Sequence, residues 1–123
     1  MRGFRSLSLL LLILLTAGAQ AQVRPDFDWA TFRTGEDLFG DCAAADDFDR
    51  GVCFGYIMAI ADALGGPGAR IDGLQACVDA PRSSEELVQT VTDFLSDNPG
   101  SRSIRADGLA AYALSLEFPC TRP

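Results

Sequence analysis

The residues of this chain with the widest choice of chemistry are its four cysteines, Cys42, Cys53, Cys77 and Cys120. The sequence contains no histidine and no lysine. A Ser-His or Cys-His nucleophile needs an imidazole, and a Schiff base or Ser-Lys dyad needs an amine, so these catalytic arrangements are excluded. A cysteine nucleophile is excluded as well if all four thiols are joined in disulfides.

Neighbouring carboxylates are the remaining candidates for acid–base chemistry. They are Asp46 with Asp47 or Asp49, and Glu85 with Glu86. A glycosidase needs two carboxyl groups that face each other across a cleft, whereas adjacent acids at the start of a helix usually cap it and face solvent. The sequence therefore predicts a protein that is not an enzyme.

The first 21 residues have the pattern of a secretory signal peptide. Arg2 and Arg5 give a positive start, residues 7–15 form an apolar run, and Ala19-Gln20-Ala21 provides a cleavage site. The alternative is a membrane anchor, but a helix that spans a bilayer needs about 20 apolar residues. We therefore predict cleavage after Ala21 and a soluble protein exported to the periplasm.

Loss of this leader leaves 102 of the 123 residues, enough for one domain with a modest core. Arg2 and Arg5 leave with it while all 17 acidic residues stay, so the net charge changes from −7 to −9. Nucleic acids and anionic membranes are disfavoured as partners, because both bind clustered cations. The charge either keeps the protein in solution or steers it toward a basic protein partner.

The mature chain has the pattern of a small all-α bundle, and no segment alternates convincingly with period two. After an irregular segment at 22–34, we expect four helices: one at 35–44, one that ends at 64, one from 84 to the stop at 98–100, and one at 104–117. The acidic run 46–49 is either the connection between the first two helices or the opening of the second. Thr34 and Ser83 are the expected N-caps, with Ser83 and Glu86 forming a capping box. The helical domain is assigned to residues 35–123.

Apolar spacing also predicts how these elements pack. Three aromatic residues before the first helix, Phe27, Trp29 and Phe32, are expected to lie over the core as a strap. Gly55 is expected to allow close approach by a neighbouring element. The expected buried faces are Cys53, Tyr56, Ile57, Ile60 and Leu64 in the second helix, Leu87, Val91, Phe94 and Leu95 in the third, and Leu109, Tyr112, Ala113 and Leu116 in the fourth.

Four cysteines allow three disulfide patterns, and spacing alone does not choose among them. Antiparallel packing of the first two helices would bring Cys42 to Cys53, and the same geometry would bring Cys77 to Cys120. We predict these two bonds, with the other two patterns still open. Metal binding is disfavoured because no close Cys-x-x-Cys pair is present and exported thiols tend to oxidise. No cofactor is predicted.

Residues 65–82 form an expected loop that begins with Gly65-Gly66-Pro67-Gly68, a sequence that ends a helix. A loop of this length in a small domain is usually functional or tied down, and a bond at Cys77 would tie it down. Candidate partner contacts are Gly66, Pro67, Arg70 and Asp72 in this loop, and the acidic cluster Asp46, Asp47 and Asp49. The alternative is an ordinary surface turn and a solvated helix start.

An ordered set of residues resembles a known family. The set comprises Gly35-x-x-Leu38, Cys42, Cys53-Phe54-Gly55-Tyr56-Ile57, Asp62, Cys77-Val78-x-x-Pro81, Leu95, Asn98-Pro99, Ala113-Leu114 and Phe118-Pro119-Cys120. This pattern resembles the Rap/Tai immunity proteins, which protect bacteria against peptidoglycan amidase toxins delivered by type VI secretion. The resemblance covers about residues 35–120.

The resemblance implies a periplasmic, mainly helical and often dimeric protein that binds a secreted peptidoglycan amidase and blocks its active-site cleft. A shared scaffold does not by itself fix function. The alternative is a general periplasmic helper, either structural or similar to an acid-stress chaperone, with no toxin partner.

Overall fold

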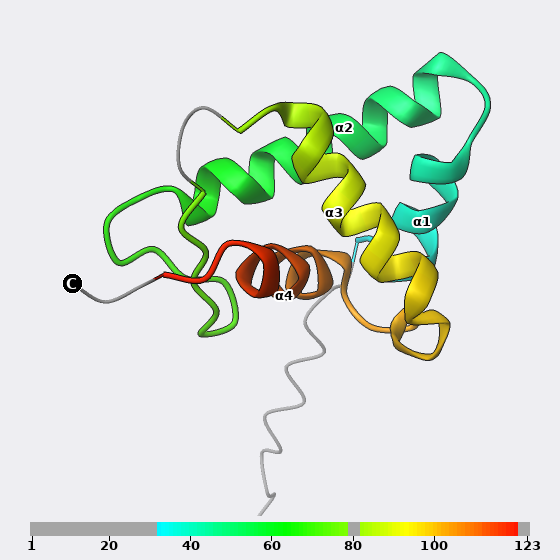
Figure 1. Ribbon diagram of the computed structural model, residues 1–123. Coiled ribbons are helices and arrows are strands. Elements are labelled where there is room, and N and C mark those ends of the chain that lie inside the picture. The colour runs from blue at the N-terminus through cyan, green and yellow to red at the C-terminus, as the bar shows by residue number, and fades with distance from the viewer. Residues whose placement is uncertain (1–31, 79–81, 121–123) are drawn as a thin grey trace, which may run out of the picture.

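The computed structural model describes residues 32–78 and 82–120, and within them the all-α fold is confirmed. Four helices are formed: α1 (Gly35–Ala43), α2 (Asp47–Leu64), α3 (Ser84–Asp97) and α4 (Ala106–Glu117), with a short 3₁₀ helix, η1 (Pro99–Ser101), before α4 (Figure 1). The described residues contain no strand, only two isolated bridges. None of these helices has both the length and the apolar character needed to cross a membrane.

The expected leader at 1–21, Phe27, Trp29 and Pro81 lie outside the described residues. Phe32, the last aromatic of the expected strap, lies inside them, and its side chain is 95% exposed. The prediction that it covers the core is therefore wrong.

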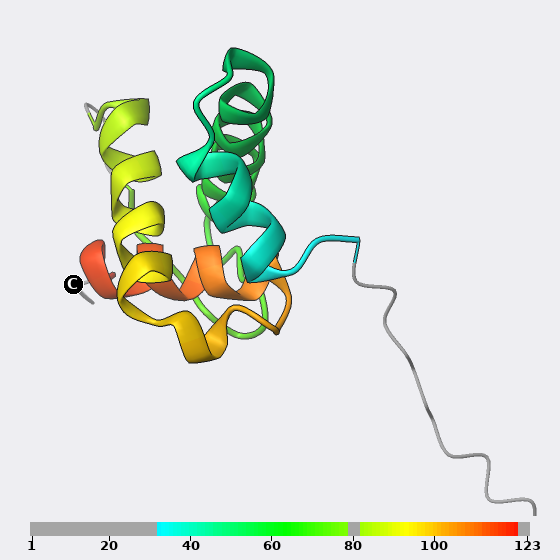
Figure 2. The ribbon, with the colours of Figure 1, turned by 90° about the vertical axis from the view of Figure 1, so that its right-hand side faces the viewer.

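The helices enclose one core. Figure 2 shows α2 and α3 beside each other, with α4 running across one end of both and α1 next to α2. The largest fully buried side chains come from all four helices and are Leu38, Ile57, Leu64, Leu95, Leu114, Val91 and Cys53. Their burial supplies the main favourable free energy of folding.

Side-chain caps fix where the first three helices begin. Thr34 and Asp37 form a complete capping box at α1, in which the Thr34 hydroxyl accepts from the Asp37 N–H at 3.2 Å. The Ser83 hydroxyl accepts from the Glu86 N–H at 3.1 Å and caps α3. The second half of the expected capping box is replaced, because the Glu86 carboxylate accepts from Arg82 at 2.7 Å.

The N-termini of α1 and α4 meet at Gly35. The N–H of Gly35 donates to the carbonyl of Ile104 and that of Glu36 donates to the carbonyl of Arg102, each at 2.8 Å. In return, the N–H of Ala106 donates to the carbonyl of Arg33 at 3.0 Å. A Cβ at position 35 would lie 2.4 Å from Leu109 Cδ1 and 3.0 Å from the backbone of Arg102. This contact therefore requires glycine.

Gly55 is not the glycine of close approach. A Cβ there would meet no atom within 4 Å, and the residue is exposed on α2. The prediction that a neighbouring element packs against it is wrong, because the spacing of apolar residues places Gly55 on the outer face of the helix. Gly35, at the helix junction, has that role.

The expected apolar faces are confirmed in part. In α2 the buried residues include Cys53, Ile57 and Leu64, while Tyr56 and Ile60 are half-buried; in α3, Leu87, Val91 and Leu95 are buried and Phe94 is half-buried. In α4 the expectation fails for Tyr112 and Leu116, which are 43% and 58% exposed. The buried face of α4 instead contains the small residues Ala106, Ala110, Ala111 and Ala113 beside Leu109 and Leu114. Small side chains allow the other helices to approach α4 closely.

Two disulfides join Cys42 to Cys53 and Cys77 to Cys120, the pattern expected from antiparallel packing. The first joins the end of α1 to α2. The second joins the loop after α2 to the chain after α4, where the Cys77 N–H also donates to the Phe118 carbonyl at 2.8 Å. Both bonds cross-link segments that the helices already bring together.

Removal of the Cys77–Cys120 disulfide is expected to lower the free energy of unfolding by about 4 kcal/mol, because the bond closes a loop with a sequence separation of 43. The Cys42–Cys53 disulfide closes a separation of only 11, and its removal is expected to cost about 3 kcal/mol. Urea denaturation of the two double Cys→Ala variants measures both values. Unchanged stability without the Cys77–Cys120 bond would contradict this account.

Gly35→Ala is expected to destabilise the fold by about 1–3 kcal/mol, because the buried Leu109 side chain and the Arg102 backbone must move away from the new methyl group. The matched control is Gly55→Ala, where the methyl group enters open space in the middle of α2. This change is expected to stabilise by about 0.5–1 kcal/mol. Thermal and urea denaturation should give opposite signs for the two variants.

Candidate functional site: a groove between α2 and α3

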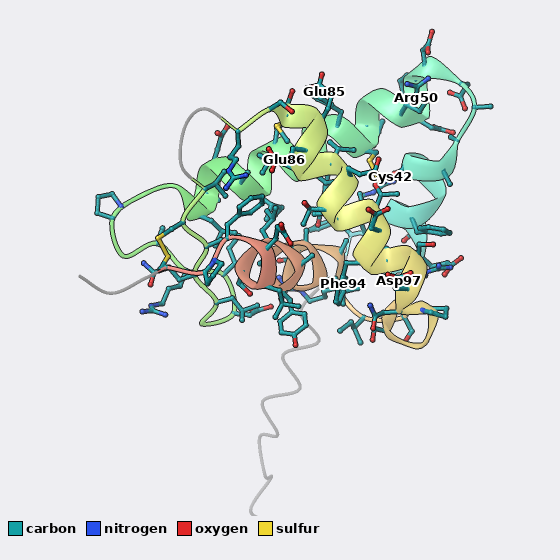
Figure 3. The ribbon with its side chains drawn as sticks, in the orientation of Figure 1. Cys42, Arg50, Glu85, Glu86, Phe94 and Asp97 are labelled. Atoms are coloured by element: carbon teal, nitrogen blue, oxygen red, sulfur yellow. A yellow bond between two sulfur atoms is a disulfide. The ribbon has the colours of Figure 1, made fainter. Side chains whose placement is uncertain are left out.

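A surface groove of about 450 Å³ lies between the first halves of α2 and α3. Its lining comes from three helices: Cys42 at the end of α1, Asp47, Arg50, Gly51, Cys53 and Phe54 on α2, and Glu85, Val88 and Gln89 on α3. Figure 3 shows Cys42, Arg50 and Glu85 on these three helices, with Asp97 at the opposite end of α3 from Glu85. The Cys42–Cys53 disulfide fixes the α1 and α2 portions of the lining to each other.

Local sequence explains why the α2 side is open. Asp46 caps α2, since its carboxylate accepts from the Asp49 N–H at 3.0 Å, so the helix begins at Asp47. Gly51 follows one turn later and has no side chain to fill the space, and a Cβ there would meet nothing within 4 Å. Phe54 then places a ring at the groove, where it is 39% exposed.

The polar residues of the groove interact weakly with one another. The Arg50 guanidinium lies 3.7 Å from the Asp47 carboxylate, and both side chains are largely exposed. Such an ion pair contributes little to stability. Among the described residues, Glu85 accepts only from the neighbouring Ser84 hydroxyl, at 3.2 Å, and the Gln89 amide donates to Asp93 at 2.6 Å. These groups are therefore available to a bound molecule.

Three carboxylates with shifted pKa values act as helix caps or as a partner in an ion pair. The N–H of Asp49 that donates to the Asp46 carboxylate lowers the pKa of Asp46 below its ordinary value of 3.8. The hydrogen bonds from the Thr34 backbone and side chain lower the pKa of Asp37 in the same way. The pKa of Asp107 is lowered by the guanidinium of Arg105. A shift of this direction marks a cap or an ion pair, and none raises a carboxyl pKa toward the range of a general acid.

The three acidic residues expected to form one contact cluster at 46–49 have different positions and roles in the structure. Asp46 is occupied as a cap, and Asp47 lines the groove with its side chain fully exposed. Asp49 lies in the first turn of α2 and supplies the backbone N–H of that cap. Only Asp47 of the three is therefore part of the groove lining.

The expected loop contacts form a separate region. Gly66 and Pro67 line a smaller pocket of about 230 Å³ that lies beside Cys77. The Arg70 guanidinium donates to the carbonyl of Gly73 at 3.0 Å, so it holds the turn that follows. Asp72 has a φ of 50°, and its carboxylate lies against Gly108 of α4. Arg70 and Asp72 thus shape the loop and dock it on α4.

The two candidate regions are not brought together. The acidic cluster opens α2 and the loop follows its end, and a helix of 18 residues is about 27 Å long. Sequence reasoning also did not identify Arg50, Phe54, Val88 or Gln89 as site residues. The i, i+4 series Glu85, Gln89, Asp93 and Asp97 opposite the apolar stripe of α3 was the available signal for one wall.

Nothing in the described part of the chain groups three or more potential metal ligands, and Glu86 of the Glu85–Glu86 pair is held by Arg82. The chain is thus a small acidic helical domain, cross-linked by two disulfides, that offers a groove and a shaped loop to another molecule.

Comparison with known proteins identifies the family. The model of a family described as Rap1a immunity proteins matches residues 34–120. The match spans more than half of the chain and nearly all of its described residues, so the chain belongs to the Rap1a immunity protein family. A search of curated proteins finds no match.

Membership identifies the chain as an immunity protein directed against a secreted effector protein. It implies an inhibitor that binds its partner and does not catalyse a reaction. The two disulfides fit an exported protein.

Stability is expected to fall in acid partly through Asp46. Its pKa is lower in the folded state than in the unfolded chain, so its contribution is present above pH 4 and is lost as the pH falls through the folded-state value. Asp46→Asn keeps an equivalent cap without a titrating group. The variant should match the wild type at pH 7 and lose less stability between pH 4 and pH 2, measured by urea denaturation.

Asp46→Ala provides the control, because it removes the cap and should be less stable than the wild type at pH 7. If Asp46→Asn lost as much stability in acid as the wild type, the titration of Asp46 would not contribute.

Proposed function

We propose that this protein is exported to the periplasm, binds a peptidoglycan amidase effector of type VI secretion and blocks the active-site cleft of that enzyme. The observation that carries the proposal is the match to the Rap1a immunity proteins over residues 34–120. The leader pattern at 1–21 supports export, and an effector that attacks peptidoglycan would have to be met in the compartment that contains its substrate.

The physical character of the surface supports an inhibitor that acts by binding. Disulfides restrain both candidate contact regions, since one bond lines the groove and the other anchors the loop at Cys77. A surface held in its bound shape before association loses less conformational entropy on binding. The excess of carboxylates would also accelerate encounter with a basic partner.

The groove and the loop at 66–73 are the proposed partner contacts. Their separation along α2 allows two modes of binding: one effector that spans both, or one region for the effector and the other for a second copy of this chain. A homodimer of the kind that the family resemblance implies is compatible with the second mode.

Rescue of growth is the direct test. Amidase-type proteins encoded next to this gene are directed to the periplasm of a laboratory host, with and without the full-length chain. We expect co-expression to restore growth and prevent lysis for the cognate amidase, and the purified pair to form a complex that no longer cleaves peptidoglycan. Survival should be measured together with amidase activity in vitro.

The matched control is the same chain without residues 1–21, which stays in the cytoplasm. It should fail to protect cells, whereas the full-length chain protects them. Absence of rescue and of complex formation with every neighbouring amidase would reject immunity against an amidase and would favour the general helper role.

A further inference from the structure

We propose that the groove between α2 and α3 binds a segment of the effector that carries an arginine or lysine next to an apolar side chain, with Asp47 and Glu85 holding the cation and Phe54 and Val88 the apolar side chain. This inference rests on the proposed function, because it assigns the effector to one face of the protein and gives the chemistry of the segment recognised.

The first argument is how the arginines of the described residues are used. Arg33, Arg50, Arg82, Arg102 and Arg105 form ion pairs with Asp41, Asp47, Glu86, Glu36 and Asp107 respectively. Arg70 donates to the Gly73 carbonyl. All six described arginines therefore have a partner within the fold, of which the exposed Arg50–Asp47 pair is weak, and the described carboxylates outnumber them.

The second argument is the position of that excess. Glu85, Asp93 and Asp97 lie on α3 at intervals of four and eight residues, so they share one exposed face with Gln89. Among the described residues, no arginine forms an ion pair with any of these three carboxylates. Glu85 belongs both to this row and to the groove lining, to which Asp47 contributes a second carboxylate from α2. The carboxylates of this row would attract a cationic partner to the side of α3 on which the groove lies.

The third argument is the apolar part of the groove lining. The Phe54 ring is 39% exposed, and Val88 and the Cys42–Cys53 disulfide also line the groove. Arginine and lysine have an apolar stem and a charged end, so they can cover such a surface while the charge reaches a carboxylate. A guanidinium over an aromatic face gains further attraction. A purely apolar segment would leave Glu85 without a cationic partner.

Arg50 is the one cation among the described lining residues, and it does not oppose this occupant. Its contact with Asp47 is 3.7 Å long between exposed side chains, so an incoming cation can replace it at little cost. The released guanidinium can donate to backbone carbonyls of the bound segment. The groove therefore offers acceptors for the side chain of the segment and a donor for its backbone.

A peptide titration tests the chemistry of the groove without any effector. The oxidised protein purified from the periplasm is labelled with ¹⁵N and titrated with acetyl-Arg-Leu-Arg-Phe-Arg-amide at low ionic strength. The amides of 47–54 and 85–89 should shift, and added salt should weaken binding. The matched peptide acetyl-Glu-Leu-Glu-Phe-Glu-amide should cause no shifts there. Shifts confined to another surface, or equal shifts with both peptides, overturn the proposal.

Two double variants with the same change in net charge distinguish binding in the groove from general attraction between opposite charges. Asp47→Asn with Glu85→Gln should weaken binding of the cationic peptide roughly five- to tenfold, because two exposed ion pairs are lost. Asp62→Asn with Glu117→Gln removes two exposed carboxylates outside the groove lining and should change binding less than twofold. Equal weakening in both doubles would show general charge attraction only and would overturn the proposal. Circular dichroism checks that each variant is folded.

The same variants separate this proposal from the proposed function. If the wild type rescues cells and the groove double binds the cognate amidase as tightly as the wild type, the effector binds elsewhere and only the groove proposal fails. If no amidase is bound but the cationic peptide maps to the groove, immunity against an amidase fails and the recognition chemistry stands. Weaker amidase binding by the groove double alone supports both.

Discussion

The structure depends on the contact between the N-termini of α1 and α4. The first N–H groups of a helix have no partner within the helix, and here each of these two helices receives a partner from the chain that leads into the other. Gly35 and Glu36 donate to carbonyls before α4, and Ala106 donates to the carbonyl of Arg33. The backbones approach so closely that no side chain fits at position 35. The direction of α1 relative to α4 is thereby fixed.

Arg102 extends this junction to α3. Its guanidinium lies 3.6 Å from the centre of the Phe39 ring on α1 and donates to the carbonyls of Leu95 and Ser96 at the end of α3. One residue thus satisfies the last turn of α3 while its own carbonyl satisfies the start of α1. At the other end of α1, the Cys42–Cys53 disulfide holds α2. The helix junction at Gly35 and Arg102 therefore positions α1 and α3, whereas the Cys42–Cys53 disulfide, which itself lines the groove, positions α2.

Features that depend on a few consecutive residues could be predicted from the sequence. The caps at Thr34 and Ser83 and the glycine–proline stop after Leu64 place three helix boundaries closely, whereas the Asp46 cap at the start of α2 was not predicted. Features that depend on neighbours could not. The spacing of apolar residues alone does not show that α4 packs on the other three helices through its alanines. Because it does so, Tyr112 and Leu116 are exposed. The groove was missed because three segments converge on it, and only Asp47 had been marked as a contact. The pairing of arginines with particular carboxylates also could not be predicted, because the sequence does not show which ion pairs form.

The pairing of the arginines affects both the stability of the fold and the charge that a partner protein meets. Most of the ion pairs of the described residues are local, as Arg33 with Asp41 at α1 and Arg105 with Asp107 at α4, whereas Arg102 pairs with Glu36 across the junction of α1 and α4. Among the described carboxylates that form no ion pair, Glu85, Asp93 and Asp97 lie along the exposed side of α3 and Asp46 and Asp49 at the start of α2, while Asp37, Asp62, Asp72 and Glu117 lie elsewhere. Repulsion among the carboxylates of α3 and α2 destabilises the protein only slightly, since exposed charges are well screened, yet the same charges set the potential that a partner meets. An acidic binding face is therefore compatible with a small stable domain, and its charges can change with the partner while the helix junction stays the same.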